Sequence, residues 1–464
     1  MIQVENLVGG KFVIPDETFD DISPTDNSVI ASIPRTKDAN SAVDAAKKAL
    51  PSWRSLTIMQ RCDWLEKIAD VLESNIEEIA RLESLDTGKP YDVALNVDAS
   101  RSVKNFRFFA DFGRNLAEET YKMSDAVNYV IRKPIGIVGL ISPWNLPLYL
   151  LTWKVAPALL MGNTIIAKPS EITPLTAHYF GQLCTKIGLP DGVLNILNGY
   201  GPEIGQSIVE HPEIKAISFT GGTETGKVVA ATAAPLFKKL SLELGGKNAS
   251  IVLEDADLQL TVPGVLRASF LNSGQICLCG SRVLIHEAIY EEFLQMYLSQ
   301  LKDFKIGPVI SHQHRDKVQS YIELAKQEGG QIVAGGKVIE KDGAWIEPTV
   351  ITGLSHKSRT ATEEIFGPVV TIHKFSTNQE AISMANSTNY GLAGSVWSKS
   401  MGKAVAEQIE SGMVWVNTWL HRDLRVPFGG VKDSGVGREG GKWSVEFFSE
   451  AVNILSLIHI SEPT

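Results

Sequence analysis

The feature that most constrains the fold is an alternation of short β-rich runs with helical segments, which starts near residue 135. The β-rich runs are Ile135–Ser142, Thr164–Ala167, Val193–Leu197, Ala216–Thr220 and Lys239–Leu244. Between them lie the helical segments Pro174–Ile187, Pro202–Glu210 and Glu224–Ala233. This alternation predicts an α/β fold with a parallel sheet and helical crossovers. Nucleotides bind at the carboxyl ends of such strands, so we expect a site there.

The chain has 464 residues, which is too long for one hydrophobic core, so two or three domains are expected. A second alternating region runs from about Ala249 to Phe428. Neither an internal repeat nor a low-complexity linker separates the two regions, which predicts interleaved domains.

Two helices are predicted ahead of the first alternating region. Residues Asp38–Leu50 form one, with Asp38 as its N-cap. Residues Thr57–Leu85 form a longer one, because their apolar side chains recur three or four residues apart. Gly88 and Pro90 are expected to end it.

Composition restricts the classes of partner. The net charge of −9 argues against a nucleic-acid binder, because phosphate backbones require clustered Lys and Arg. The most apolar stretch, Leu146–Met161, holds Lys154 and two prolines and is too short to span a bilayer, so we interpret it as buried core. There are only four cysteines and the start has no signal-like pattern, so we expect reduced thiols in the cytoplasm.

The segment from Asn272 to Arg282 contains the candidate nucleophile Cys277 next to a Gly-containing turn. A thiolate attacks a carbonyl carbon and gives a thiohemiacetal from which hydride can leave. Two alternatives exist. A single cysteine is more often a buried structural residue than a nucleophile, and Cys277 together with Cys279 could bind a metal ion. The clamp lacks the further Cys or His ligands that a structural zinc site needs.

Two other segments could supply catalytic groups. Glu243 ends a β-run just before two glycines, where a carboxylate can act as general base for water or thiol. Asn145 follows another β-run in a turn made rigid by two prolines, and its amide could donate to an oxyanion. Taken alone, the first is better explained as a surface carboxylate and the second as an ordinary turn.

Two glycine patterns resemble nucleotide motifs without satisfying them. Gly199-x-Gly201-x-x-x-Gly205 misses the dinucleotide fingerprint by one residue. The stretch Gly221–Lys227 fits a P-loop, but Val228 stands where magnesium requires Ser or Thr. A strand followed by Gly221, Gly222 and a helix is still a suitable pyrophosphate site, because the helix start offers backbone N–H groups.

In combination, these segments resemble the aldehyde dehydrogenase superfamily over about Leu7 to Ile454. The specificity lies in the order of the motifs, which is PWN, KPSE, FTGGTETG, LELGGKN, GQIC, EEIFGPV and PFGGVKDSGVGRE. The resemblance implies a Rossmann-type cofactor domain, an α/β catalytic domain and a small β arm for oligomerisation. We expect residues 1–115 and 134–244 in the first, 245–448 in the second, and 116–133 with 449–464 in the arm.

The resemblance also implies catalytic roles. Cys277 takes the nucleophile position of GQIC, and Glu243 the general-base position of LELGG. Asn145 takes the oxyanion role together with the backbone N–H of Cys277. Glu439 matches a second carboxylate that relays protons.

The cofactor implied by the resemblance is NAD. Lys168 and Glu171 match residues that bind the adenosine ribose, and a carboxylate there favours NAD because it repels the 2′-phosphate of NADP. The remaining implied cofactor residues are Glu364 and Phe366 at the nicotinamide ribose, Gly221 and Gly222 along the cofactor path, and the supporting Trp144.

For the substrate, the resemblance is to the branch that oxidises 2-aminomuconic 6-semialdehyde or 2-hydroxymuconic semialdehyde. Arg101 and Arg422 are then expected to bind the substrate carboxylate, because guanidiniums offer planar bidentate donors. Without the resemblance, Arg101 and Arg422 are explained equally well as two surface arginines in ion pairs. The alternatives are a broader enzyme for betaine aldehyde, retinal or aliphatic aldehydes, in which both arginines would be dispensable, and a non-catalytic member.

The sequence departs from the superfamily pattern in two places. Between Lys305 and Ile310 it is shorter than is usual, which we expect to affect a surface loop of the catalytic domain. From Ser456 to Thr464 it looks foreign or truncated, although relatives use a C-terminal strand to join subunits into a homodimer or homotetramer. The expected partners are a small aldehyde and further copies of the chain, with no nucleic acid and no membrane.

Overall fold

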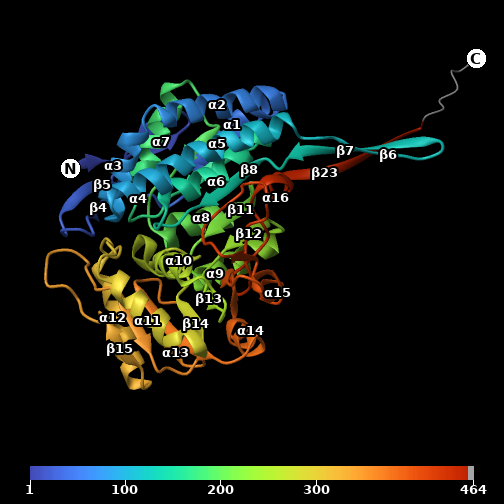
Figure 1. Cartoon of the computed structure of the whole chain (residues 1–464). Coiled ribbons are helices and arrows are strands. Elements are labelled where there is room, and N and C mark those ends of the chain that lie inside the picture. Colours follow the sequence, from blue (N-terminus) through green and yellow to red (C-terminus); the bar gives the residue numbers. More distant parts are fainter. Residues whose placement is uncertain (458–464) are drawn as a thin grey trace, which may run out of the picture.

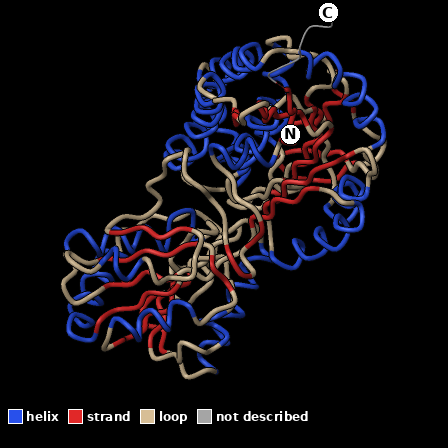
Figure 2. The backbone as a smooth tube through the Cα atoms, turned by 90° about the vertical axis from the view of Figure 1, so that its right-hand side faces the viewer, coloured by secondary structure: helices blue, strands red, loops and turns tan. Residues whose placement is uncertain are grey.

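The computed structural model describes residues 1–457 and contains two large α/β sheets and a projecting β arm (Figures 1 and 2). The first sheet has eight strands in the order β22-β12-β11-β8-β9-β10-β2-β3. Its five central strands are β8 (Ile137–Ile141), β9 (Thr164–Lys168), β10 (Leu194–Ile196), β11 (Ile214–Thr220) and β12 (Lys239–Glu243). They pair in parallel, which confirms the predicted α/β fold. Antiparallel neighbours complete the edges, namely β22 (Gly435–Val436), β2 (Asn6–Val8) and β3 (Lys11–Val13).

Helical crossovers connect these strands near the predicted positions. They are α6 (Pro147–Leu160), α7 (Leu175–Lys186), the π-helical turn η2 (Gly201–Gly205) with α8 (Gln206–Glu210), and α9 (Thr223–Ala233) with the 3₁₀ turn η3 (Ala234–Leu236). Every residue of α6 is buried, so the apolar stretch is core, as predicted. Within residues 1–457, no helix combines the length and the apolar character that a membrane crossing requires.

The first predicted helix differs from the structure at both ends. Helix α1 covers Asn40–Ser55, and its N-cap residue is Ala39, without a side-chain cap. The carboxylate of Asp38 accepts instead from the backbone N–H of Asn40 in the turn ahead of the helix. The assignment of Asp38 as N-cap was therefore wrong by one residue.

The single helix predicted over Thr57–Leu85 is two helices, α2 (Ile58–Glu73) and α3 (Ile76–Thr87). The break falls at Ser74 and Asn75, whose side chains donate to the carbonyls of Asp70 and Val71 and so compete with the helical pattern. Apolar periodicity continues across this break and could not reveal it. Gly88 then ends α3 in the left-handed region (φ 71°), as predicted.

The second sheet has seven strands in the order β15-β16-β17-β14-β13-β19-β20. They are β13 (Ala249–Val252), β14 (Arg282–His286), β15 (Gln331–Ala334), β16 (Thr349–Thr352), β17 (Val369–Phe375), β19 (Ala393–Trp397) and β20 (Met413–Val416). All pairs except β15–β16 are parallel. Associated helical elements are α10 (Leu258–Phe270), η4 (Leu271–Gly274), η5 (Glu287–Ile289), α11 (Tyr290–Leu301), α12 (His312–Gln327), α13 (Arg359–Thr362), α14 (Asn378–Asn386) and α15 (Gly402–Ala406).

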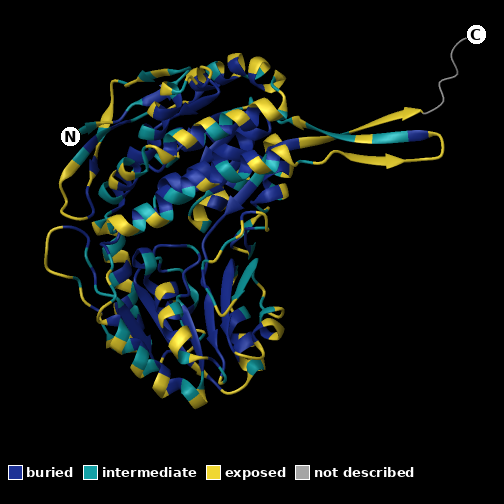
Figure 3. Cartoon of the chain, turned by 45° about the horizontal axis from the view of Figure 1, so that its top comes forward, coloured by how far each residue is buried: buried dark blue, intermediate teal, exposed yellow. Residues whose placement is uncertain are grey.

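The arm is a three-stranded antiparallel sheet that extends away from the body (Figures 1 and 3). It consists of β6 (Glu119–Lys122), β7 (Ala126–Pro134) and β23 (Ser449–Leu457). Ser449 pairs with Pro134 at the base of the arm, and Leu457 pairs with Ala126 near its tip. Of the tail expected to be foreign, Ser456 and Leu457 lie in β23, and residues 458–464 lie outside the described part.

Smaller elements complete the chain. A three-stranded sheet is formed by β1 (Ile2–Gln3), β4 (Thr18–Ile22) and β5 (Val29–Pro34), and a two-stranded one by β18 (Tyr390–Gly391) and β21 (Val431–Lys432). The other helical elements are α4 (Tyr91–Val93), the π-helical η1 (Ala94–Ala99), α5 (Ser100–Arg114) and α16 (Gly441–Phe447).

Candidate active site

A cavity of about 250 Å³ lies where carboxyl ends of the first sheet face the second α/β unit. Its lining comes from segments that are far apart in the sequence and includes most of the predicted site residues. The lining residues are Pro143, Trp144, Asn145, Leu150, Thr220, Gly221, Gly222, Leu244, Gly245, Cys277, His314, Lys317, Glu364 and Phe366.

The loop that carries Cys277 has an unusual backbone. Asn272 (φ 53°), Ser273 (φ 57°) and Gly274 (φ 72°) all lie in the left-handed region. A Cβ on Gly274 would lie 2.2 Å from the carbonyl oxygen of Gly367, so this position requires glycine. The Ser273 hydroxyl donates to the Gly307 carbonyl at 2.8 Å, which ties the strained loop to a neighbouring segment.

The Cys277 thiol is held in its neutral form. Burial raises its pKa, the charges of Glu243 and Glu364 raise it further, and Arg422 opposes them. A neutral thiol is a poor nucleophile, so a nearby base must take its proton. The Cys277 carbonyl accepts from the Asn248 side chain at 2.7 Å, which fixes the peptide next to the thiol.

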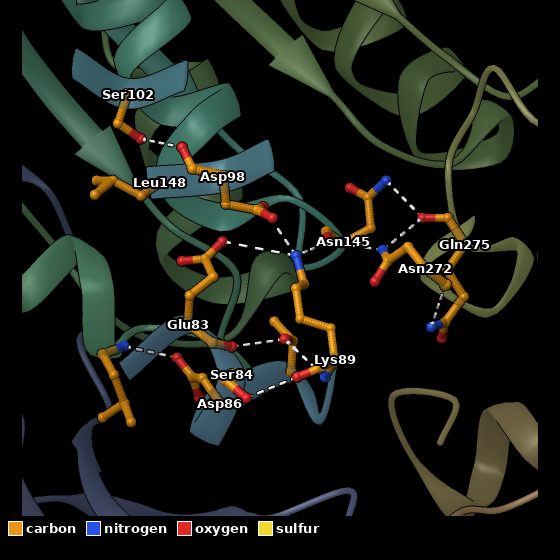
Figure 4. A network of polar contacts seen from close by, with 12 residues as sticks. Glu83, Ser84, Asp86, Lys89, Asp98, Ser102, Asn145, Leu148, Asn272 and Gln275 are labelled. Carbon is orange, nitrogen blue, oxygen red and sulfur yellow. Dashed lines mark hydrogen bonds and ion pairs between the residues drawn. The ribbon is translucent and has the colours of Figure 1, made fainter. Parts of the chain in front are cut away.

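Asn145 is buried and directed at this loop (Figure 4). Its Nδ2 donates to the Gln275 carbonyl at 3.0 Å. An amide NH₂ has two hydrogens, so a second donor remains for a ligand in the cavity. Its own backbone carbonyl accepts from Lys89 Nζ at 2.9 Å and from Asn272 Nδ2 at 3.1 Å.

Glu243 ends β12, and both of its carboxyl oxygens are buried without a hydrogen-bond partner among residues 1–457. Burial raises its pKa well above the ordinary value, and the negative charge of Glu439 raises it further. Gly429 approaches closely, since a Cβ there would lie 2.7 Å from Glu243 Oε1. A carboxyl group with a raised pKa suits a base that must exchange protons near neutral pH.

Neither Glu243 nor Glu439 is among the residues that line the cavity, and the two carboxyl groups are close enough for their charges to interact. Its Oε1 accepts from Lys154 Nζ at 2.7 Å, and that ammonium also donates to Ser218 Oγ at 2.9 Å. The motifs do not reveal Lys154 as a residue of this site. A lysine inside the wholly buried α6 is the available signal, because an unpaired buried ammonium is too costly to retain.

The residues expected at the adenosine ribose lie at the carboxyl end of β9. Lys168 Nζ pairs with Glu171 Oε2 at 2.9 Å. Burial alone would raise the pKa of Glu171, but the charge and hydrogen bond of Lys168 lower it below the ordinary value. Glu171 is therefore ionised and could accept from ribose hydroxyls.

The segment that leads into α9 lines the cavity through Thr220, Gly221 and Gly222, whereas Lys168 and Glu171 lie outside the lining. No atom lies within 4 Å of a Cβ built on Gly222, so the backbone is open to a ligand there. The hydroxyls of Thr220 and Thr223 are buried without a partner among the described residues. Together with the first N–H groups of the helix, they fit a pyrophosphate group.

The nicotinamide end of the cavity is formed by Glu364 and Phe366. Glu364 Oε1 accepts from the Gly246 N–H at 2.8 Å, and a Cβ on Gly245 would lie 2.3 Å from its other oxygen. Phe366 (φ 61°) meets Trp144 edge-on, with ring centroids 5.3 Å apart. Glu364, Phe366 and Trp144 are therefore arranged so that they could contact the ribose and the ring of a nicotinamide cofactor.

Helix α12 adds two lining residues that the sequence did not suggest, His314 and Lys317. His314 Nε2 donates to the Phe366 carbonyl at 2.6 Å, and burial lowers its pKa to about 4, so it is neutral. No local motif marks either residue, because α12 reaches the cavity only through the packing of the two α/β units.

The two candidate substrate arginines flank Tyr149. Arg422 Nη1 donates to the Tyr149 hydroxyl at 2.7 Å, and the Arg101 guanidinium lies 5.7 Å from the centre of its ring. Both side chains are half-buried, and neither forms an ion pair with a carboxylate of residues 1–457. The neighbouring Asp423 pairs with Arg425 instead. The alternative of surface ion pairs is therefore not what the structure shows.

The short segment after Lys305 is not a surface loop, contrary to our expectation. Residues 307–310 are buried. The Ile310 N–H donates to Gln275 Oε1 at 2.9 Å, and a Cβ on Gly307 would lie 2.6 Å from the Gly88 carbonyl oxygen. The segment forms hydrogen bonds with Ser273 and Gln275 of the Cys277 loop, so it supports the site itself.

This combination of fold and site is that of an aldehyde-oxidising enzyme. The model of the aldehyde dehydrogenase family matches residues 12–454, and the chain belongs to that family. It is accordingly an oxidoreductase that uses a nicotinamide cofactor and a small aldehyde substrate.

Individual relatives are similar over nearly the whole chain. The chain is 45% identical to 2-aminomuconic semialdehyde dehydrogenase of Mus musculus, over 98% of each sequence. It is 42% identical to 2-hydroxymuconic semialdehyde dehydrogenase of Pseudomonas sp. (strain CF600), over 98% of this chain and 99% of that protein. The NAD⁺ complex of aldehyde dehydrogenase from Bacillus cereus superimposes with a TM-score of 0.96 at 37% identity, over 98% of this chain and 97% of that one.

Proposed function

We propose that this chain oxidises a muconic semialdehyde bearing a carboxylate, 2-aminomuconic 6-semialdehyde or 2-hydroxymuconic semialdehyde, to the dicarboxylic acid with NAD as the oxidant. The observation that carries the proposal is the pair of half-buried guanidiniums around Tyr149, which have no carboxylate partner among residues 1–457. The charge of Arg422 reaches the Cys277 thiol, and two such cations side by side are complementary to an anionic aldehyde. The names of the relatives at 42–45% identity support the same substrate class.

The first chemical step falls to Cys277. Glu243 in its ionised form takes the thiol proton, and the sulfur forms a bond to the aldehyde carbon. The carbonyl oxygen becomes an oxyanion, which accepts from the free N–H of Asn145 and from the backbone N–H of Cys277. Holding the aldehyde against the thiol also removes the entropic cost of bringing the two together.

The second half restores the thiol. A bound nicotinamide cofactor would supply the acceptor for the hydride that leaves the substrate carbon. What remains on Cys277 is a thioester. Glu243 releases the thiol proton to solvent and then takes a proton from water, while the water oxygen attacks the thioester carbon. The C–S bond breaks, the thiolate regains a proton, and the carboxylate product is released. The balance is one aldehyde, one NAD⁺ and one water to one carboxylate, one NADH and two protons.

Glu171 supports NAD over NADP. Its ionised carboxylate at the end of β9 would accept from the 2′- and 3′-hydroxyls of a ribose and repel a 2′-phosphate. Lys168 cannot offset this repulsion, because it already pairs with the same carboxylate.

We further propose a homo-oligomer joined through the arm. Both outer strands, β6 and β23, have a free edge in the described chain. Apolar side chains on the arm are exposed, including Tyr121, Met123, Ile454, Leu455 and Leu457. A three-stranded sheet exposed in this way is more stable when a second copy covers it.

The test compares the arginines in an NADH-formation assay. We expect Arg101→Ala and Arg422→Ala each to lower kcat/KM for the muconic substrate by about ten- to a hundredfold, because each loses a charged hydrogen bond. The rate with an uncharged aldehyde of similar length should change much less. Arg425→Ala is the matched control, since Arg425 is exposed and pairs with Asp423.

If the arginine variants lose kcat/KM equally for charged and uncharged aldehydes, the proposed substrate class is wrong. The chain would then be an aldehyde dehydrogenase of broader specificity. A wild type that gives no NADH with any aldehyde, and whose Cys277 is labelled by a thiol reagent at the same rate with and without NAD, would indicate a non-catalytic member.

A further inference from the structure

Lys89 is a buried lysine whose charged end faces the backbone of the active site (Figure 4). It lies directly after Gly88, where α3 ends, and the cavity lining does not include it. Its Nζ donates to Asp98 Oδ1 at 2.8 Å and to the backbone carbonyl of Asn145 at 2.9 Å, and Glu83 lies 3.9 Å away. A residue outside the cavity thus holds the peptide of the proposed oxyanion donor.

The contacts continue from Asn145 into the Cys277 loop. Asn272 Nδ2 donates to the same Asn145 carbonyl at 3.1 Å and to the Gln275 carbonyl at 3.2 Å. The Asn145 side chain donates to that Gln275 carbonyl as well. Figure 4 shows the resulting chain of contacts from Lys89 through Asn145 to Gln275, two residues before the nucleophile.

The backbone at Asn145 has no regular structure to hold it. It precedes Leu146, the N-cap of α6, whose dihedrals (φ −136°, ψ 67°) are not helical. Rotation of the Asn145–Leu146 peptide would move the side-chain amide relative to Cys277. Two buried donors on one carbonyl fix that rotation, and one of the two is an ammonium.

A buried ammonium is an expensive way to satisfy a carbonyl oxygen. Desolvation of a charged pair costs several kcal/mol, and apolar replacements are often as stable. Burial and the nearby charge of Asp98 raise the pKa of Glu83 well above its ordinary value, and Asp98 at 2.8 Å is the closer partner of the Lys89 ammonium, with Glu83 at 3.9 Å. Stability alone does not account for such an arrangement next to a catalytic amide.

We propose that Lys89 is a positioning residue for the oxyanion donor, which acts by fixing the carbonyl of Asn145 so that the Asn145 amide stays directed at the Cys277 loop. This inference rests on the proposed function, since it assigns Lys89 a part in the same step. Geometry of this kind matters, because misplacement of a catalytic group by about 1 Å costs about a hundredfold in rate.

The experiment is a double-variant cycle with Lys89→Met and Asn145→Ala in the full-length protein. Lys89→Met alone should lower kcat by about ten- to a hundredfold while KM changes little. In the Asn145→Ala background the same change should cost less than threefold, because the group it positions is gone. Lys238→Met is the matched control, since Lys238 is also a buried lysine that donates to a backbone carbonyl, that of His211, at the amino end of β12.

An equal loss in both backgrounds would overturn the proposal, because a general structural role does not depend on the Asn145 side chain. So would a kcat for Lys89→Met within twofold of the wild type. Where Lys89→Met does not give folded protein, Asp98→Asn replaces it, since an amide oxygen still accepts from Nζ but holds it less firmly. The same dependence on Asn145 is then expected, and an additive loss overturns the inference.

A cofactor-free assay separates this inference from the proposed function. Hydrolysis of p-nitrophenyl acetate needs the thiol and the oxyanion donors but neither NAD nor an aldehyde. When Lys89→Met and Asn145→Ala are combined in this assay, Lys89→Met should again lower the rate of ester hydrolysis less in the Asn145→Ala background than in the wild type. If the wild type hydrolyses the ester with that coupling but oxidises no muconic semialdehyde, the proposed function fails and the role of Lys89 stands.

Discussion

Glu243 is buried and Cys277 is half-buried, and the proposed base and the nucleophile are both neutral at rest. The negative charge of Glu243 raises the pKa of the Cys277 thiol, so only one of the two groups ionises readily at a time. The site therefore stays unreactive until an aldehyde accepts the sulfur and the charge moves to the oxyanion. This arrangement limits oxidation of an idle thiol, because the thiolate is the reactive form.

The oxyanion donor gives the first prediction at this scale. Asn145→Ala removes one of two donors and should lower turnover by at least about a hundredfold, since one donor contributes about 2.7–4 kcal/mol. Steady-state NADH formation checks this value. Turnover within a few-fold of the wild type would remove Asn145 from the catalytic set.

The raised pKa of Glu243 predicts a pH dependence. Glu243 acts as a base only when ionised, so turnover should fall as the pH drops through its raised pKa, well above the ordinary 4.5. Glu439→Gln removes a negative charge that raises this pKa, so the acid limb should move to lower pH. Steady-state kcat measured across pH gives the position of the acid limb in both proteins. If the limb does not move in Glu439→Gln, the titrating group is not Glu243.

At the scale of elements, the site depends on a loop that only glycine can complete. Gly274 has a positive φ and no room for a side chain beside Gly367, although the elements around it are regular. The loop forms hydrogen bonds with Asn145, with Asn248 and with the buried residues 307–310.

Gly274→Ala tests this dependence. Left-handed strain costs about 1–2 kcal/mol, and the clash with the Gly367 carbonyl adds to it, so we expect a lower thermal midpoint and a loss of turnover of about a hundredfold. Gly188→Ala is the control, because Gly188 has a similar φ of 75° and nothing within 4 Å of its Cβ. Equal effects of the two changes on turnover would show that strain alone, and not the packing of this loop, is responsible.

At the scale of the whole molecule, the arm exposes apolar side chains that the single chain does not bury. Leu455 is 52% exposed and lies on β23, which pairs with β7 on one side only. In Figure 3 the arm is largely exposed, in contrast to the buried centre of the body.

We expect the wild type to have a solution mass that is a multiple of the chain mass, and Leu455→Asp to lower it. The substitution costs the isolated chain little, because the side chain already faces solvent, but a charge in a covered apolar interface is unfavourable. Sedimentation equilibrium measures the mass. Leu260→Asp is the control, as Leu260 is 54% exposed on α10, which belongs to the second α/β unit and not to the arm. A monomeric wild type, or an unchanged mass in Leu455→Asp, would contradict the proposed role of the arm.

Sequence by itself determined the parallel sheet, the burial of α6 and the order of the motifs, because periodicity and strand–helix alternation are local properties. It also pointed to Asn145, Cys277 and Phe366, which lie in recognisable motifs and line the cavity.

Only the tertiary structure decided which distant groups act on them. Lys89 and His314 carry no local signal, and Lys154 signals only that it needs a partner. Their partners lie 56, 52 and 285 residues away in the chain, respectively. The break at Ser74, the buried course of residues 307–310 and the absence of an ion pair at Arg422 among residues 1–457 were likewise undetermined. Hydrogen bonding and burial depend on what packs against a residue, and that becomes fixed only when the two α/β units come together.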